Sequence, residues 1–223
     1  MPLFKIINHD VSTTILVWKI TETFSELFNE VRLNDKSKLR LNGMKSQLHQ
    51  CAFLSVRKLL QEVDYTDFDL YYDEFGKPHL KDGNHISITH SHEFAALIIS
   101  NQKVGIDIEM QREKIIRIAD KFIDYEFHYL NKEEPQDYIS KLTVIWGVKE
   151  SIFKIRNEPG ISFKNNIKVN SFQMQGKEAL AWLHMENLKI PFSIYFKEID
   201  SSSESFQNEQ VKQNFILVYA FEK

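Results

Sequence analysis

The chain has 223 residues, and 28 Lys and Arg stand against 31 Asp and Glu, a net charge of −3. That balance offers nucleic acid no overall attraction, so we expect no nucleic-acid partner. Hydrophobic residues make up 43% of the chain, and this fraction excludes a disordered chain. The single cysteine, Cys51, excludes an internal disulfide and a cysteine-cluster zinc site. The first residues show no signal-peptide pattern and no apolar run is long enough to span a bilayer. We therefore expect a cytoplasmic protein with no membrane partner.

The first hundred residues predict strands on both sides of a helix. The predicted elements are strands within 3–20, a helix over 45–61, and paired strands at 85–89 and 95–99 around a turn at 90–93. Between the helix and the paired strands, Gly76 and Pro78 mark a further turn in residues 73–78, because they favour turn dihedrals and interrupt regular pairing.

Residues 36–58 form a basic segment that contains no Asp or Glu. Its cations are Lys36, Lys38, Arg40, Lys45, Arg57 and Lys58. Such a segment can face phosphate or an acidic partner, and it can equally be the solvated face of a helix.

Residues 104–110 predict a half-buried strand that carries two carboxylates. Aliphatic side chains alternate with Gly105, Asp107 and Glu109, so that one face enters a core and the other presents both acids. The two carboxylates repel one another unless a cation lies between them, and hard oxygen ligands suit Mg²⁺ or Mn²⁺. We expect Gly105, on the same face, to leave room for a bulky group to approach the metal.

The second half of the chain predicts helices followed by strands. Helical zones cover about 114–130 and 138–156, strands are expected at 167–169, 181–185, 190–196 and 215–221, and a mobile loop at 200–213. The order of elements predicts an α+β fold, divided into an N-terminal half of residues 1–103 and a C-terminal half of residues 104–223.

The helix over 138–156 brings further charged side chains beside an apolar stripe. Glu150 and Lys154 are four residues apart and lie together at the edge of this stripe, where a plain surface ion pair would also explain them. Lys149 projects near its middle, where an ammonium must snorkel, lose its proton or find an anion. A phosphate or a carboxylate of a metal site would supply that anion.

Glu150 together with Asp107 and Glu109 gives three carboxylates from two elements. Such a set can hold an octahedral Mg²⁺ and leave coordination positions for phosphate oxygens and water. These residues therefore indicate phosphoryl-type transfer, in which a metal and lysines offset the charge of a pyrophosphate.

Four segments in order resemble the signatures of the 4′-phosphopantetheinyl transferases. They are Phe75-Gly76-Lys77-Pro78, Ile88-Thr89-His90-Ser91, Gly105-Ile106-Asp107-Ile108-Glu109, and Trp146-Gly147-Val148-Lys149-Glu150-Ser151 with Lys154. Thr89 replaces the usual serine of the second segment. The length is similar to that of the surfactin-synthetase-type subgroup, and this implies a monomer whose two similar α+β halves form an intramolecular pseudo-dimer with coenzyme A between them.

The resemblance also implies roles for individual residues. Asp107, Glu109 and Glu150 would hold Mg²⁺ against the pyrophosphate of coenzyme A, and Glu150 would act as base on the acceptor serine. Lys149 and Lys154 would contact phosphates, with Lys154 stabilising or protonating the departing 3′,5′-ADP. Further phosphate contacts would come from Lys77 and His90, with Ser91 or Thr89. The acceptor would be an apo acyl carrier protein or peptidyl carrier protein.

Two other functions use the same residues. A metal-dependent nucleotide or coenzyme A pyrophosphatase would need the three carboxylates but would use water as its acceptor. A non-catalytic module that binds coenzyme A or a carrier protein would need no base beside the metal. The complete set of Asp, Glu, Glu and Lys favours the transferase.

Overall fold

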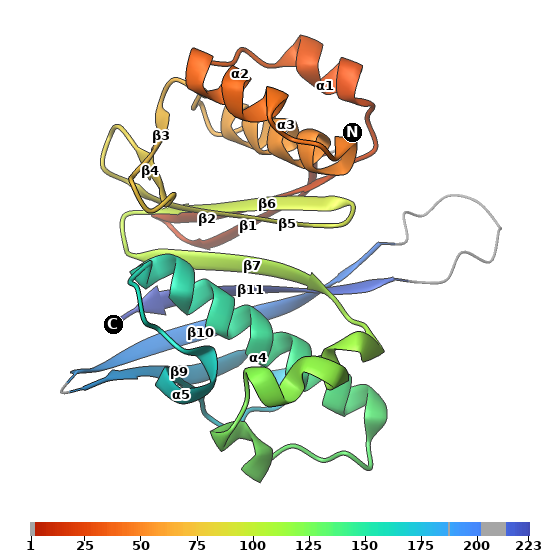
Figure 1. Ribbon diagram of the computed structural model, residues 1–223, viewed down its shortest axis with the longest axis vertical. Helices are drawn as coiled ribbons and strands as arrows, with labels where there is room; N and C mark the ends of the chain where they lie inside the picture. Colours follow the sequence, from red (N-terminus) through yellow and green to blue (C-terminus); the bar gives the residue numbers. More distant parts are fainter. Residues whose placement is uncertain (1–2, 187, 202–212) are drawn as a thin grey trace, which may run out of the picture. The chain divides into compact units, whose positions relative to one another are not determined.

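The computed structural model describes residues 3–186, 188–201 and 213–223 (Figure 1). The chain divides into two compact units, Met1–Val104 and Gly105–Lys223. Each unit combines helices with a sheet, which confirms the α+β prediction. No helix among the described residues is both long and apolar enough to cross a membrane.

The first unit is built on a sheet with the strand order β1-β2-β6-β5. Its strands are β1 (Leu3–Asp10), β2 (Thr13–Lys19), β6 (Phe94–Ser100) and β5 (His85–Ser91). Neighbouring strands are antiparallel, and Leu16 of β2 lies opposite Leu97 of β6 in the middle of the sheet. The strands expected within 3–20, 85–89 and 95–99 are therefore confirmed.

One predicted helix and two unpredicted helices complete the first unit. Helix α3 (Gln47–Gln61) lies along the sheet (Figure 1) and packs its apolar stripe on β2 and β6. Helix α1 (Phe24–Glu30) begins at a capping box made by Thr23 and Glu26. Helix α2 (Asp35–Asn42) follows the cap of Asn34, whose side chain accepts from the backbone of Ser37. The sequence contains both cap signals.

The short strands β3 (Leu70–Tyr72) and β4 (Pro78–Leu80) pair around the predicted turn. Asp73 holds this turn, because one oxygen of its carboxylate accepts the backbone N–H groups of both Phe75 and Lys77. Gly76 has a φ of 81°, a value that glycine adopts without strain.

The second unit is built on a sheet with the order β7-β11-β10-β9-β8. Its strands are β7 (Val104–Met110), β11 (Asn214–Glu222), β10 (Leu188–Asp200), β9 (Glu178–Met185) and β8 (Ile167–Val169). Helix α4 (Pro135–Arg156) crosses this sheet (Figure 1), packs most extensively on β11, and ends at Asn157 in the left-handed conformation. The predicted strands and the second helix are confirmed, and residues 202–212 of the predicted loop lie outside the described residues.

The helical zone expected over 114–130 is not one α-helix. It forms two 3₁₀ segments, η1 (Glu113–Lys121) and η2 (Tyr125–His128). Phe122 and Ile123, between the two segments, are buried in the core of this unit. A continuous α-helix is replaced here because core contacts at this junction override the local apolar periodicity.

Candidate functional site

Glycines let α4 approach β7 and β11 closely. A Cβ on Gly105 would lie 2.0 Å from the backbone oxygen of Ser151, and one on Gly147 would lie 2.7 Å from Cγ2 of Val218. The space at Gly105 is thus filled by the backbone of α4. The expectation that it leaves room for a ligand is wrong, and its role is to bring the acidic strand against the helix.

Asp107 and Lys154 join β7 to α4. Lys154 donates from Nζ to Oδ1 of Asp107 and to the carbonyl oxygen of Ile106, both at 2.8 Å. The Asp107 side chain is 7% exposed and that of Lys154 is 26% exposed. This ion pair therefore lies at the boundary between core and solvent, where a bound ligand can still reach the lysine.

Glu109 and Glu150 belong to the same electrostatic cluster as Asp107. The pKa of Glu109 is raised to about 7, first by burial and then by the charges of Asp107 and Glu150, while a hydrogen bond from Trp146 acts in the opposite direction. The pKa of Glu150 is also raised, first by burial and then by Asp107. The structure thus brings the three predicted carboxylates into one region where their negative charges oppose one another.

The chemistry of these carboxylates fits a hard divalent cation such as Mg²⁺. Their oxygens are the ligands that this ion prefers, and a cation would relieve the repulsion that the raised pKa values report. Within the described residues, however, no three His, Cys, Asp or Glu side chains converge on one point as they lie.

Lys149 lies elsewhere, in the core of the unit. Its Nζ donates to the carbonyl oxygens of Phe122, Phe163 and Ile167 at 2.7–3.0 Å, and its side chain is fully buried. Of the three outcomes expected for this ammonium, the structure shows a nearby anion, the carboxylate of Glu126, which is 2.8 Å away and also fully buried. A phosphate contact by Lys149 does not fit this geometry, because carbonyls and a carboxylate already surround its ammonium.

The other predicted phosphate-binding residues belong to the first unit. Lys77 lies in the turn between β3 and β4, and Thr89, His90 and Ser91 end β5. His90 is exposed and its ring lies 5.7 Å from that of His49 on α3. Thr89 is 5% exposed, since successive side chains of a strand face opposite sides. His90 is therefore better placed than Thr89 to meet a ligand, and Ser91 is half-buried at the end of the strand.

The basic segment is not one surface. Arg57 is 2% exposed and pairs with Asp67 at 2.9 Å, so it is a structural ion pair of the first unit. Lys58 pairs with Glu30. A solvated helix face is therefore the wrong description of the Arg57 position.

Two other cations of this segment border a pocket. Lys36 and Arg40 line a space of about 600 Å³ between α2 and the β3–β4 hairpin. The guanidinium of Arg40 lies 4.6 Å from the ring centre of Tyr72, within the range of a cation–π contact. This pocket pairs positive charge with aromatic surface.

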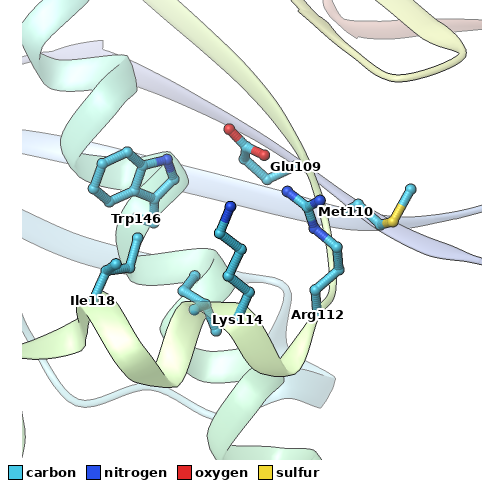
Figure 2. Close-up of a pocket in the computed structure, with 7 residues that line it drawn as sticks. Glu109, Met110, Arg112, Lys114, Ile118 and Trp146 are labelled. Atoms are coloured by element: carbon cyan, nitrogen blue, oxygen red, sulfur yellow. The ribbon is translucent and has the colours of Figure 1, made fainter.

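Sequence reasoning missed two cations beside Glu109. Figure 2 shows Arg112 and Lys114 extending toward the same space as the carboxylate of Glu109. Together they line a pocket of about 210 Å³ whose other lining residues are Met110, Ile115, Ile118 and Trp146. The signal was present in the sequence, because both cations follow the acidic strand directly and two residues apart.

The comparisons with known proteins agree with this geometry. A family model described as the 4′-phosphopantetheinyl transferase superfamily matches residues 103–214, half of the chain. The matched region contains β7 and α4, which carry the carboxylate cluster.

Relatives carry the same family name. The 4′-phosphopantetheinyl transferase gsp of Aneurinibacillus migulanus is 31% identical over 150 residues, which cover 66% of this chain and 61% of the relative. The 4′-phosphopantetheinyl transferase Sfp of Bacillus subtilis strain 168 is 32% identical over 99 residues, 42% of this chain and 43% of the relative. Each matched segment spans less than two thirds of the relative's length. The family model, which covers half of the chain, nevertheless decides the assignment: this chain belongs to the 4′-phosphopantetheinyl transferase superfamily.

Proposed function

We propose that the protein transfers the 4′-phosphopantetheine arm of coenzyme A to a serine hydroxyl of an apo acyl or peptidyl carrier protein. The observation that carries this proposal is the cluster of Asp107, Glu109, Glu150 and Lys154 on β7 and α4. Membership of the superfamily and the names of the relatives support it. We further propose that the protein acts as a monomer in the cytoplasm.

The charges of the cluster fit the chemistry of phosphoryl transfer. Mg²⁺ held by Asp107, Glu109 and Glu150 would stabilise negative charge on the pyrophosphate, and Mn²⁺ has the same ligand preference. Lys154 lies within reach of that charge and can stabilise the departing phosphate. Ion pairing to Asp107 keeps its ammonium in place before the substrate arrives.

Glu150 is suited to accept the proton of the acceptor serine. Its carboxylate belongs to the same cluster as Asp107 and Lys154, and a carboxylate is one of the side chains that act as general bases. The serine oxygen would bond to the phosphorus that bears pantetheine, and the bond from that phosphorus to the 3′,5′-ADP oxygen would break. The serine proton passes to Glu150, while the electron pair of the broken bond stays on the departing 3′,5′-ADP.

The 3′-phosphate of coenzyme A, its one phosphate outside the pyrophosphate, would be bound by residues of the first unit. We assign this role to Lys77, His90 and Ser91, which lie at a hairpin turn and at the end of β5. Thr89 and Lys149 would act by supporting the fold around these sites, since both are buried.

The test is a transfer assay with purified protein, coenzyme A, MgCl₂ and a panel of apo carrier proteins. Intact-mass spectrometry should show one added phosphopantetheine arm, with release of 3′,5′-ADP. Glu150→Gln should slow the transfer by about 10²–10⁴-fold, the usual contribution of general acid–base catalysis. Glu133→Gln is the matched control, because Glu133 is an exposed glutamate just before α4.

Different results would point to the other functions. Hydrolysis of coenzyme A without any carrier would identify a pyrophosphatase. Tight binding of coenzyme A without transfer to any carrier of the panel would identify a binding module. Full activity of Glu150→Gln would remove Glu150 from the mechanism.

A further inference from the structure

His79 on β4 reaches back to the turn that joins β3 to β4. Its Nε2 lies 3.0 Å from Oδ2 of Asp73, and the two side chains are 35% and 32% exposed. The pKa of Asp73 is lowered from its ordinary value, and the largest cause is this hydrogen bond. An ionised carboxylate can only accept, so the ring N–H of His79 is the donor.

Asp73 in turn fixes the backbone of Lys77. Its other carboxylate oxygen, Oδ1, accepts the N–H groups of Phe75 and Lys77 at 3.0 and 2.9 Å. The backbone N–H of Asp73 donates to the carbonyl oxygen of Lys77 at 3.1 Å. Asp73 thus holds both backbone polar groups of Lys77, and its conformation determines the direction in which the Lys77 side chain leaves the turn.

Tyr71 holds the imidazole of His79 in place from the neighbouring strand. The two residues lie directly opposite one another in the β3–β4 pair, and their rings stack with centres 5.3 Å apart and an angle of 21° between planes. Tyr71 is 50% exposed, whereas Leu70 and Leu80 of the same hairpin belong to the core.

The contact between His79 and Asp73 therefore acts locally. A partly exposed ion pair adds little to the free energy of unfolding. It does hold one oxygen of the Asp73 carboxylate toward β4, and this leaves the other oxygen facing the backbone N–H groups of the turn. The chain of contacts runs from His79 through Asp73 to the backbone of Lys77.

We propose that His79 is a positioning residue for the binding of coenzyme A. It acts through Asp73, which orients Lys77 so that the lysine ammonium meets the 3′-phosphate. Fixing the turn before the substrate arrives lowers the entropy that binding must remove. The inference rests on the proposed transferase function, in which Lys77 contacts this phosphate, and adds the two residues that prepare the contact.

The experiment compares the binding of coenzyme A with that of dephospho-coenzyme A, which lacks the 3′-phosphate. Calorimetry gives both dissociation constants, and their ratio measures the preference for the phosphate. His79→Ala should lower this preference about two- to fivefold, the range of a partly exposed ion pair, and leave the affinity for dephospho-coenzyme A unchanged. Asp73→Ala should lower it about tenfold, because it also removes the acceptor of two backbone N–H groups.

Three comparisons separate positioning from a general structural role. Glu74→Ala removes an exposed carboxylate from the same turn and should change the preference by less than about twofold. His79→Gln keeps an amide donor near the position of Nε2 and should retain most of the preference. In a Lys77→Ala background, His79→Ala should have no further effect, because its influence passes through Lys77.

The transfer assay gives an independent readout. His79→Ala should raise the KM for coenzyme A by the same factor as the dissociation constant and leave kcat at saturating coenzyme A unchanged. The reason is that the proposed reacting groups lie on β7 and α4, away from this hairpin in the sequence. Urea denaturation should show that every variant is folded with nearly the stability of the wild type.

An equal loss of affinity for both ligands in His79→Ala would show a structural role and overturn the inference. An unchanged preference, or a full additional effect in the Lys77→Ala background, would also overturn it. A wild type that binds both ligands equally would remove the phosphate contact and the inference with it. Failure of the wild type to transfer the arm is a different result that rejects the proposed function, and calorimetry still tests the positioning role in that case.

Discussion

Lys149 and Lys154 lie five residues apart on α4, yet their surroundings are opposite. Lys149 is fully buried and held by Glu126 and three carbonyl oxygens. Lys154 keeps 26% of its side chain exposed and pairs with Asp107 at the border of the carboxylate cluster. Both ion pairs measure 2.8 Å, so distance alone does not separate a structural pair from a functional one.

The difference lies in what else each lysine can reach. The Lys149 ammonium joins α4 to the segments around Phe122 and Ile167, and a ligand has no access to it. Lys154 neighbours Glu109 and Glu150, whose pKa values are raised by burial and by the charge of Asp107. We therefore expect changes at Lys149 to affect stability, and changes around Lys154 to affect pH response, metal response and transfer.

Lys149→Met should lower the free energy of unfolding by about 3–5 kcal/mol, because it leaves the Glu126 carboxylate buried without its cation. Urea denaturation followed by circular dichroism measures the loss. Lys141→Met is the matched control: Lys141 pairs with Asp137 one turn apart on the same helix and should cost below about 1 kcal/mol. The double variant Lys149→Met/Glu126→Gln should recover part of the loss, and equal stability of Lys149→Met and wild type would contradict the structural role.

Gly105→Ala should cost about 1–3 kcal/mol or more, because the new Cβ would meet the backbone oxygen of Ser151 at 2.0 Å and force α4 away from β7. The shift should also reduce transfer, since it separates Asp107 from the residues of α4. Thermal unfolding and the transfer assay measure the two effects. Gly176→Ala is the control, as a Cβ there has no neighbour within 4 Å, and similar losses in both variants would argue against the close approach.

The wild-type protein without metal should lose stability, on the order of 2 kcal/mol, as the pH rises from about 4.5 through 7. The pKa of Glu109 is raised to about 7 in the folded state, so the folded protein binds the extra proton, and this advantage disappears once that proton leaves. Denaturation midpoints at pH 5 and pH 8 in EDTA measure the change. Glu109→Gln should flatten the profile, and MgCl₂ should stabilise the wild type more at pH 8 than at pH 5. A wild-type profile that rises over this range would show the opposite sign.

Lys154→Met should lower the free energy of unfolding by only about 1 kcal/mol, because its ion pair is partly exposed. Transfer should fall far more than stability, by at least about tenfold at saturating coenzyme A, since the variant cannot stabilise the departing phosphate. Steady-state kinetics beside urea denaturation separate the two readouts. A large loss of stability with normal kcat in the folded fraction would show that Lys154 has a structural role, as Lys149 does, and would contradict the proposed difference between the two lysines.

The local patterns determined the elements that carry the site. Alternation of apolar and polar residues predicted β7, and apolar periodicity predicted α4. The sequence then shows directly which acids and lysines these two elements carry. Cap signals for α1 at Thr23 and for α2 at Asn34 were present but went unused. The helix expected over 114–130 failed for a different reason, because core contacts of Phe122 and Ile123 divide it into two 3₁₀ segments.

The sequence by itself determined that acidic and basic groups stand together on one strand and one helix, because side-chain direction follows from the period of each element. For Lys149 it left three outcomes open, namely a side chain that reaches solvent, a lost proton or a nearby anion. Only the tertiary structure decided that the partner of Lys149 is Glu126, that Arg57 pairs with Asp67, and that the backbone of α4 fills the space at Gly105. Depth of burial depends on which distant segments pack together, and the period of a single element contains no information about them.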